Sequence, residues 1–201
     1  MVSMRDARDE AFRRAGIPAD GGDSEPWVDF KLGPIPMPFP NTDARRRTVK
    51  FHDLHHVLTG YRTDIFGEFE ISAWELGAGC GRFGVAWGLN LMGLVGGLLS
   101  SPRRTVRAFW RGRRSDSLYT TRSYDEVLDQ PVEEVRRWLR VPGEADPVAP
   151  TASDVLHLAA ASLAGLVLGL ATFAIILTPV TLAAWVLTYG AYRREVARRS
   201  A

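Results

Sequence analysis

The feature that most constrains this chain is a long uncharged run near the end of its 201 residues. Val155–Tyr192 spans 38 residues without Asp, Glu, Lys or Arg. This is about twice the ~20 residues that one helix needs to cross a bilayer, and a globular core seldom supplies such a run. A straight helix of that length would far exceed the ~30 Å hydrocarbon layer, so we expect a break at Thr178-Pro179.

This break predicts a transmembrane helical hairpin with the arms Leu156–Leu177 and Val180–Tyr192. Small residues at four-residue spacing suit close packing between helices, and they are Ala161, Gly165 and Gly169. Four arginines follow within 193–199, and the positive-inside rule places them on the cytoplasmic side. A hairpin returns the preceding domain to that side, whereas a single kinked span would put it outside. The alternative is a soluble hydrophobic hairpin that is buried on a partner.

Composition divides the chain into an N-terminal segment at 1–27, a helical domain at 28–141, a linker at 142–150 and the hairpin with its basic tail at 151–201. The linker contains three prolines within nine residues, which indicates an extended connection. The first twenty residues interleave acids with arginines, so they predict neither a secretory signal nor a transit peptide.

Helix signals recur through the domain, whereas strand signals are poor. The proline-rich Lys31–Pro40 predicts an extended stretch that ends at a helix cap within 41–43. We expect helices at about 43–60, 64–80, 83–100, 102–114 and 131–140. The fold class is therefore all-α.

The charge of the chain argues against nucleic acid as a partner, and its cysteine content limits the kinds of metal ligand. The formal net charge is +2, but 193–201 alone carries four arginines and one glutamate, so the rest of the chain is slightly acidic. Such a domain lacks the basic footprint of phosphate binding, and nucleic acid is not an expected partner. The single Cys80 can form neither an internal disulfide nor a thiolate cluster, so any metal needs nitrogen and oxygen ligands.

The candidate metal ligands lie in the stretch Phe51–Glu70. On a helix, His52, Asp53 and His56 share one face within about 100°. Glu68 lies on the next predicted helix, from which its carboxylate can reach back across an antiparallel pair. Two nitrogens and two carboxylates suit Zn, Mn or ferrous iron. The alternative is a polar helix face beside an unrelated glutamate.

These residues also carry a family resemblance. The spacing HDxxH, eleven residues, then Glu, and the text HVLTGY at His56–Tyr61 are similar to the metal motif of the coenzyme Q (ubiquinone) biosynthesis protein 4 family. The resemblance covers about 28–141 and continues in Gly67-Glu68, Trp74-Glu75-Leu76, Arg111-Gly112 and Val127–Leu139.

The resemblance implies an all-α, membrane-associated protein that binds zinc, or iron or manganese, through His52, Asp53, His56 and Glu68. It implies a polyprenyl lipid or quinone precursor in a hydrophobic tunnel, with other quinone-biosynthesis enzymes as partners and a homodimer as one possible assembly. The family has been assigned the oxidative C1 decarboxylation of a polyprenylated hydroxybenzoate, a lyase reaction. The 155–201 tail has no counterpart in the family pattern, and no mitochondrial presequence is present. We therefore expect a bacterial homologue at the inner (cytoplasmic) membrane, with the main domain facing the cytoplasm.

The uncharged Gly84–Ser100 is the candidate tunnel helix, and a plain core helix is the alternative. The candidate tunnel residues are Trp87, Gly88, Leu91, Gly93 and Leu94. Glu75 follows Glu68 by seven residues on the same helix face, where it can support a ligand or simply be solvated. We do not expect His55 or His157 to be ligands.

Three other functions compete with this reading. A membrane di-iron desaturase needs more than the four histidines of this chain. An HD-type phosphohydrolase needs a histidine upstream of His52, and the sequence has none there. A non-catalytic, metal- and lipid-binding scaffold of a membrane biosynthetic complex fits the same residues as an enzyme does.

Overall fold

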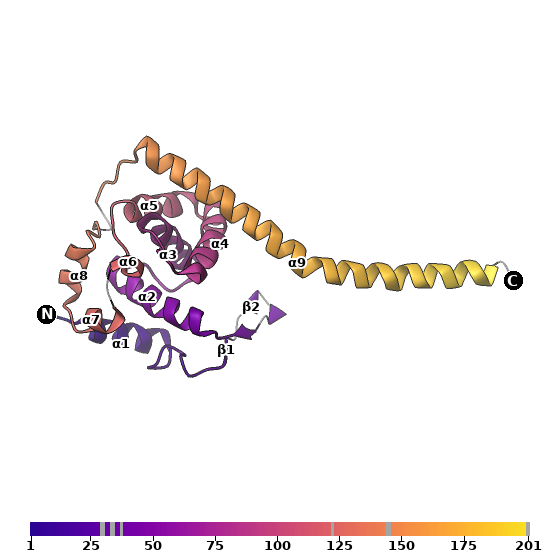
Figure 1. The fold of residues 1–201 in the computed structure, drawn as a ribbon, viewed down its shortest axis with the longest axis horizontal. Helices are drawn as coiled ribbons and strands as arrows, with labels where there is room; N and C mark the ends of the chain where they lie inside the picture. Colours follow the sequence, from indigo (N-terminus) through magenta and orange to yellow (C-terminus); the bar gives the residue numbers. More distant parts are fainter. Residues whose placement is uncertain (29–30, 33–34, 37, 122, 144–145, 200–201) are drawn as a thin grey trace.

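The structure is a computed structural model that describes residues 1–28, 31–32, 35–36, 38–121, 123–143 and 146–199. Helices gather into one domain, and a long C-terminal helix runs across it and then leaves it (Figure 1). The described strands form only two two-stranded antiparallel pairs. The all-α fold class is confirmed.

The five helices expected in the domain are confirmed. Thr42 caps the first of them, because its side chain accepts from the Arg45 N–H, and Asp64 caps the second through the Gly67 N–H. Pro102 opens the fourth at a position where a missing N–H costs nothing. Their bounds are α2 Asp43–Thr59, α3 Ile65–Ala78, α4 Gly84–Ser100, α5 Pro102–Gly112 and α8 Val132–Trp138.

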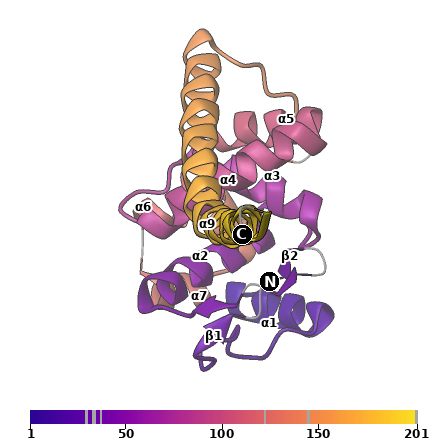
Figure 2. The same cartoon turned by 90° about the vertical axis from the view of Figure 1, so that its right-hand side faces the viewer.

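Three further helices were not expected from the sequence: α1 Met4–Ala15, α6 Leu118–Thr121 and α7 Tyr124–Leu128. The Met4 side chain is fully buried in the domain core, and its N–H donates to the Gln130 carbonyl. In both ribbon views α1 and α7 lie at the end of the domain away from the start of the C-terminal helix (Figures 1 and 2). The segment 1–27 therefore belongs to the domain.

The proline-rich stretch is extended in its described parts. β1 Trp27–Val28 pairs with β4 Phe39–Pro40, and β2 Lys31–Leu32 pairs with β3 Ile35–Pro36. These pairs lie at the N-terminal end of α2, next to the Thr42 cap.

Close helix contacts place α3 in the centre of the domain. A Cβ at Gly112 of α5 would lie 2.1 Å from the carbonyl oxygen of Trp74, and one at Gly77 would lie 2.4 Å from that of Phe109. Only glycine permits this approach between α3 and α5. The contact buries Trp74 and Phe109, and it fixes the α3 side chains that face α2.

The expected hairpin is wrong. The C-terminal segment forms one helix, α9 Ala152–Arg199, with Pro179 inside it. Proline removes one backbone hydrogen bond, but the turns on either side stay helical, and the Thr178 hydroxyl donates to the Ala174 carbonyl. A helix that bends at proline needs no return arm.

The packing partner of α9 is α4, not a second arm. A Cβ at Gly165 would lie 2.4 Å from the Leu91 carbonyl oxygen, and Leu158 and Ala161 pack against the domain core. Asp154, which is almost fully buried, pairs with Arg113 and Arg114 and anchors the start of the helix. Helix α4 therefore covers part of the small-residue face that we assigned to the hairpin, namely Gly165, whereas a Cβ at Gly169 would meet nothing within 4 Å.

Two consequences follow for the tail. Ala152–Ile175 is one helix that is long and apolar enough to cross a membrane, which keeps membrane association open to test. The argument for a cytoplasmic domain relied on a hairpin, and a single helix removes that support.

The linker is held against the domain by hydrogen bonds. The backbone carbonyl oxygens of Pro142 and Ala149 accept hydrogen bonds from the guanidinium groups of Arg111 and Arg114.

Candidate metal centre

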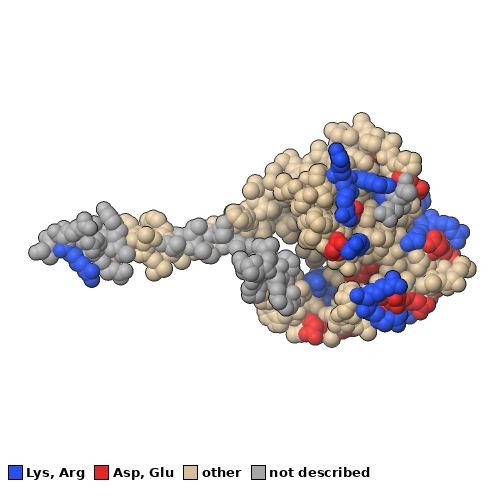
Figure 3. Space-filling model, turned by 180° about the vertical axis from the view of Figure 1, so that it is seen from behind, with Lys and Arg blue, Asp and Glu red and all other residues tan. Residues whose placement is uncertain are grey.

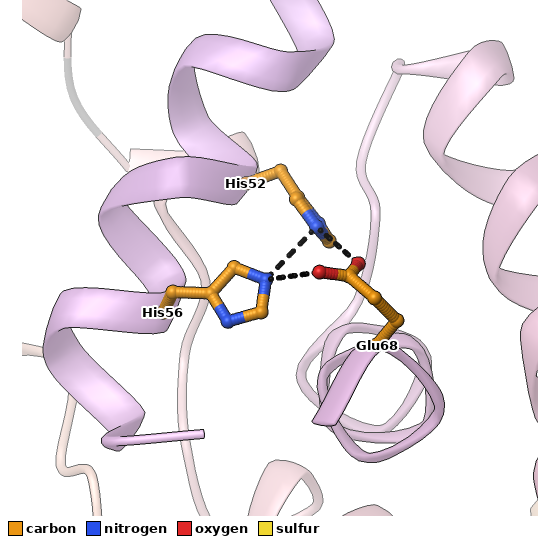
Figure 4. Close-up of side chains that lie close together, drawn as sticks. All are labelled: His52, His56 and Glu68. Carbon is orange, nitrogen blue, oxygen red and sulfur yellow. Dashed lines mark hydrogen bonds and ion pairs between the residues drawn. The ribbon is translucent and has the colours of Figure 1, made fainter. Parts of the chain in front are cut away.

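The turn between α2 and α3 brings the candidate ligands together. Helix α2 ends at Gly60, which has a φ of 77° and caps it in the left-handed region. Helix α3 starts soon afterwards at Ile65 and crosses α2 instead of running back along it, since Figure 4 shows α2 from the side and α3 end-on. The antiparallel pair expected from the sequence is therefore wrong, but Glu68 in the first turn of α3 still points toward His52 and His56.

Three side chains converge at this point (Figure 4). His52 Nε2 lies 3.2 Å from Glu68 Oε2, and His56 Nε2 lies 3.3 Å from Glu68 Oε1. The two Nε2 atoms lie 3.2 Å from each other. One ion could contact all three side chains, because their ligand atoms lie within 4.8 Å of one another.

The hydrogen bonds behind the rings show which nitrogens are free to bind a metal. His56 Nδ1 lies 3.0 Å from the Tyr61 carbonyl oxygen, which can only accept, so this nitrogen carries the proton. His52 Nδ1 lies 3.0 Å from Glu75 Oε1 and donates in the same way. In the neutral rings both Nε2 atoms then present lone pairs toward each other and toward a carboxylate. Such a group is repulsive unless protons on the rings or a metal cation lie in its midst.

The charges around the site favour a divalent cation. Burial opposes the charged form of His52, but Glu75 and Glu68 outweigh it and raise the pKa of His52 well above its ordinary value. Burial likewise opposes the charged form of Glu68, but hydrogen bonds from His52 and His56 lower the pKa of its carboxyl to about 2. When a metal displaces the protons from Nε2, the two carboxylates with two neutral imidazoles carry two negative charges, which one divalent ion balances.

Asp53 is not brought into this cluster. Its side chain lines a neighbouring cavity of about 180 Å³, together with Arg8, Gly21, Lys50 and Tyr124. Burial raises the pKa of the Asp53 carboxyl to about 6. The helical rotation of about 100° per residue turns Asp53 away from His52 and toward the α1 side. Its role as a ligand stays a prediction.

Glu75 is buried rather than solvated, and it lies behind the ligands. Its carboxylate contacts both His52 and His55, and it also contacts Asn90 and Tyr119. His55 is not a ligand, as expected, because its Nε2 accepts from the Leu118 N–H. The seven-residue spacing from Glu68 was the available sequence signal for Glu75, whereas nothing in the sequence linked Asn90 or Tyr119 to the site.

The remaining histidine lies on α9, where His157 Nδ1 contacts the carbonyl oxygen of Ser153, four residues earlier. It is not part of the cluster formed by His52, His56 and Glu68.

Some of the candidate tunnel residues on α4 pack inside the protein, and others lie at its surface. Leu94 is fully buried in the core, and a Cβ at Gly93 would lie 2.3 Å from Ser72 Oγ, so both pack α4 against α3. The Leu91 carbonyl contacts α9 at Gly165. Trp87 is exposed and its Nε1–H donates to the Gly81 carbonyl, while a side chain at Gly88 would meet open space. The lipid tunnel stays a prediction.

A larger cavity of about 1020 Å³ lies beside α2, α6 and α7. Aromatic rings of Phe51, Phe83 and Tyr119 form part of its wall, and the cations Arg47 and Arg82 lie at it as well. None of the α4 residues proposed for the tunnel lines either of these two cavities.

Comparison of the chain with protein-family models found no match. Comparisons with curated proteins and with solved structures found no match either. The functional conclusion therefore rests on the site itself and on the sequence resemblance.

Proposed function

We propose that this chain is a membrane-associated metal protein that holds one divalent ion through His52, His56 and Glu68. The observation that carries this proposal is the convergence of two Nε2 atoms on one carboxylate, with both Nδ1 atoms occupied by acceptors. Imidazole and carboxylate ligands suit zinc, ferrous iron or manganese. Three protein ligands leave further positions for water or substrate, as in catalytic rather than structural sites.

We further propose that the protein acts in the biosynthesis of ubiquinone or a related prenylquinone, and this step depends on the family resemblance. A bound ion would supply Lewis acidity toward the carboxylate and hydroxyl of a polyprenylated hydroxybenzoate. The residues of the chain hold that ion at an accessible place, because the Glu68 side chain is 41 % exposed. A ring-bearing head group can therefore approach from the Glu68 side, with oxidative decarboxylation as the reaction.

One observation favours the alternative of a non-catalytic scaffold. Among the described residues behind the ligands, the acid and base groups are already engaged: Glu75 accepts several hydrogen bonds, and Tyr119 donates to Glu75. A proton-transfer residue beside the ion would have to come from Asp53 or from the substrate. An ion that only stabilises the fold and a lipid head group would give the same geometry.

The long helix α9 supports the membrane part of the proposal. Charged side chains gather on the domain, whereas the described surface of α9 is uncharged except near its C-terminal end (Figure 3). Large apolar side chains on its first half are about half to two-thirds exposed, among them Leu163, Leu166, Val167, Leu170 and Phe173. Exposed apolar surface of this extent indicates a membrane or protein contact, and the uncharged length of α9 favours a membrane.

One experiment tests the proposed function. Protein extracted in mild detergent is analysed by native mass spectrometry and by elemental analysis, so that the bound lipid and ion are identified together. We expect one divalent ion per chain and a polyprenyl lipid or quinone precursor. Metal-loaded protein is then given a polyprenylated hydroxybenzoate and oxygen. Turnover supports the enzyme, metal and lipid without turnover support the scaffold, and protein without metal rejects the proposal.

Gly88→Phe tests the lipid position without disturbing the helix contacts, because a side chain there meets open space. If Gly88 lines the lipid site, the variant retains less lipid per mole of bound metal than the natural chain. Gly93→Phe is unsuitable for this purpose, since Ser72 already fills the space beside Gly93.

A further inference from the structure

We propose that Glu75 is the positioning residue of the metal centre: its buried carboxylate fixes the tautomer and orientation of His52, so that Nε2 of this ring is presented to the ion. The inference rests on the proposed metal site, and it concerns a residue that would not contact the ion. Three features of the structure carry it.

The first feature is the number of groups that hold Glu75 in place. Its Oε1 accepts from His52 Nδ1 at 3.0 Å and from His55 Nδ1 at 2.7 Å. Its Oε2 accepts from Asn90 Nδ2 at 2.6 Å and from the Tyr119 hydroxyl at 3.0 Å. Each oxygen thus receives two hydrogen bonds, which is the full capacity of a carboxylate. A carboxylate held from four directions has no freedom to turn away from His52.

The second feature is that the direction of the His55 hydrogen bond is unambiguous. The Leu118 backbone N–H donates to His55 Nε2 at 3.0 Å, so this nitrogen carries no proton and Nδ1 must carry it. His55 is therefore a neutral donor with both nitrogens satisfied inside the core. It donates to the same Glu75 oxygen that contacts His52 Nδ1. An ionised carboxylate oxygen can only accept, so His52 Nδ1 is the donor of that second bond.

The third feature is the placement of charge. Glu75 is completely buried, and a buried carboxylate is costly unless it is paired and hydrogen-bonded. Among the residues that the structure describes, none of the side chains that hydrogen-bond to it is Lys or Arg. A cation bound on the far side of the His52 ring would compensate this charge. A carboxylate behind a ligating imidazole raises the basicity of the metal-facing nitrogen, and outer partners of this kind typically affect metal affinity 10–100-fold.

Glu75→Gln tests this inference, because it removes the charge while keeping an amide oxygen as an acceptor for His52. We expect zinc or cobalt affinity to fall about tenfold or more. We also expect the visible absorption bands of the cobalt-loaded protein to change, since His52 would become a weaker ligand. A residue with only a structural role would lower the melting temperature and leave both readouts of the folded protein unchanged.

Glu70→Gln is the matched control. Glu70 lies on the same helix and its carboxylate pairs with Arg104, outside the histidine cluster. We expect its metal affinity and cobalt spectrum to match those of the natural chain. Equal affinity and equal spectra in Glu75→Gln and Glu70→Gln would overturn the inference.

A measurement on the natural chain covers the case in which Glu75→Gln does not fold. Nitrogen-15 NMR of the histidine rings, recorded with and without zinc, reports which nitrogen carries the proton and which binds the metal. We expect His52 to bind zinc through Nε2 with its proton on Nδ1. Zinc on Nδ1 would overturn the role of Glu75, whereas a natural chain that binds no metal would overturn the metal site itself.

Discussion

The metal centre and helix α9 are both prominent in the sequence, but they are built in opposite ways. The centre uses few residues, each buried or partly buried and each held by specific hydrogen bonds. Helix α9 has many interchangeable apolar residues, most of them exposed, and a few contacts that hold it. Hydrogen bonds are directional, so a set of polar side chains specifies a particular geometry. The hydrophobic effect is not directional, so an apolar run specifies only that some apolar surface must cover it.

The largest effect expected from this comparison is at the ligands. His52→Ala, His56→Ala or Glu68→Ala should each lower metal content by orders of magnitude, because a three-ligand site loses a third of its protein donors. Elemental analysis of purified protein measures this. His157→Ala, on α9, is the control and should keep full metal content. Stoichiometric metal in all three ligand variants would show that His52, His56 and Glu68 do not hold the ion.

Acid should destabilise the metal-free protein through the same cluster. The pKa of Glu68 lies at about 2 in the folded protein against an ordinary value of 4.5, so its stabilising effect is complete above pH 4.5 and is lost as the pH falls toward 2. Its partial exposure screens the effect to on the order of 1 kcal/mol. The raised pKa of His52 acts in the opposite sense: its contribution is full below about 6.5 and is lost as the pH rises through the raised value.

Urea unfolding at several pH values checks this prediction. The natural metal-free chain should be most stable at mildly acidic pH, and Glu68→Gln should show a shallower loss below pH 4.5. Parallel pH profiles for the two proteins would contradict the assignment of that loss to Glu68.

A smaller effect is expected where α9 crosses α4. Gly165→Ala places a methyl group against the Leu91 carbonyl, and forcing it in should cost on the order of 1–3 kcal/mol of unfolding free energy. Gly169→Ala is the matched control on the same helix, because a Cβ there meets nothing within 4 Å. Equal stability of the two variants would mean that α9 does not dock on α4 as the structure has it.

The smallest effect concerns Cys80, which should stay unreactive toward thiol reagents in the native protein. Its thiol is fully buried, and burial together with the charge of Glu75 raises its pKa to about 12. Labelling with an alkylating reagent, with and without denaturant, checks this. Rapid labelling of the native chain would show that the core around Glu75 opens readily.

Because Cys80 should not react in the native chain, cysteines introduced elsewhere can be labelled selectively to test where α9 lies. Leu170→Cys within the candidate span of α9 and Ser123→Cys on the domain are both at exposed positions. In membranes we expect a water-soluble maleimide to label Ser123→Cys and to leave Leu170→Cys protected. Labelling both equally would place α9 in water or on a partner protein. Applying the reagent from each side of the membrane then shows which side the domain faces.

Much of the fold was predictable because its signals are local. Caps and prolines near Thr42, Asp64 and Pro102 located helices to within a few residues. Helix α1 was missed because its charged surface hides the two buried residues, Met4 and Phe12, that tie it to the domain. A short amphipathic helix gives little periodic signal when so few of its side chains are buried.

The sequence by itself determined that His52 and His56 share one helix face and that a long apolar run follows the domain. These properties depend on spacing along a helix, which is the same in any surroundings. The tertiary structure decided that Asp53 faces another cavity, that Glu75 is buried behind His52, and that α9 packs on α4. Such choices depend on long-range contacts with residues such as Asn90, Tyr119 and Leu91, whose positions no local pattern contains.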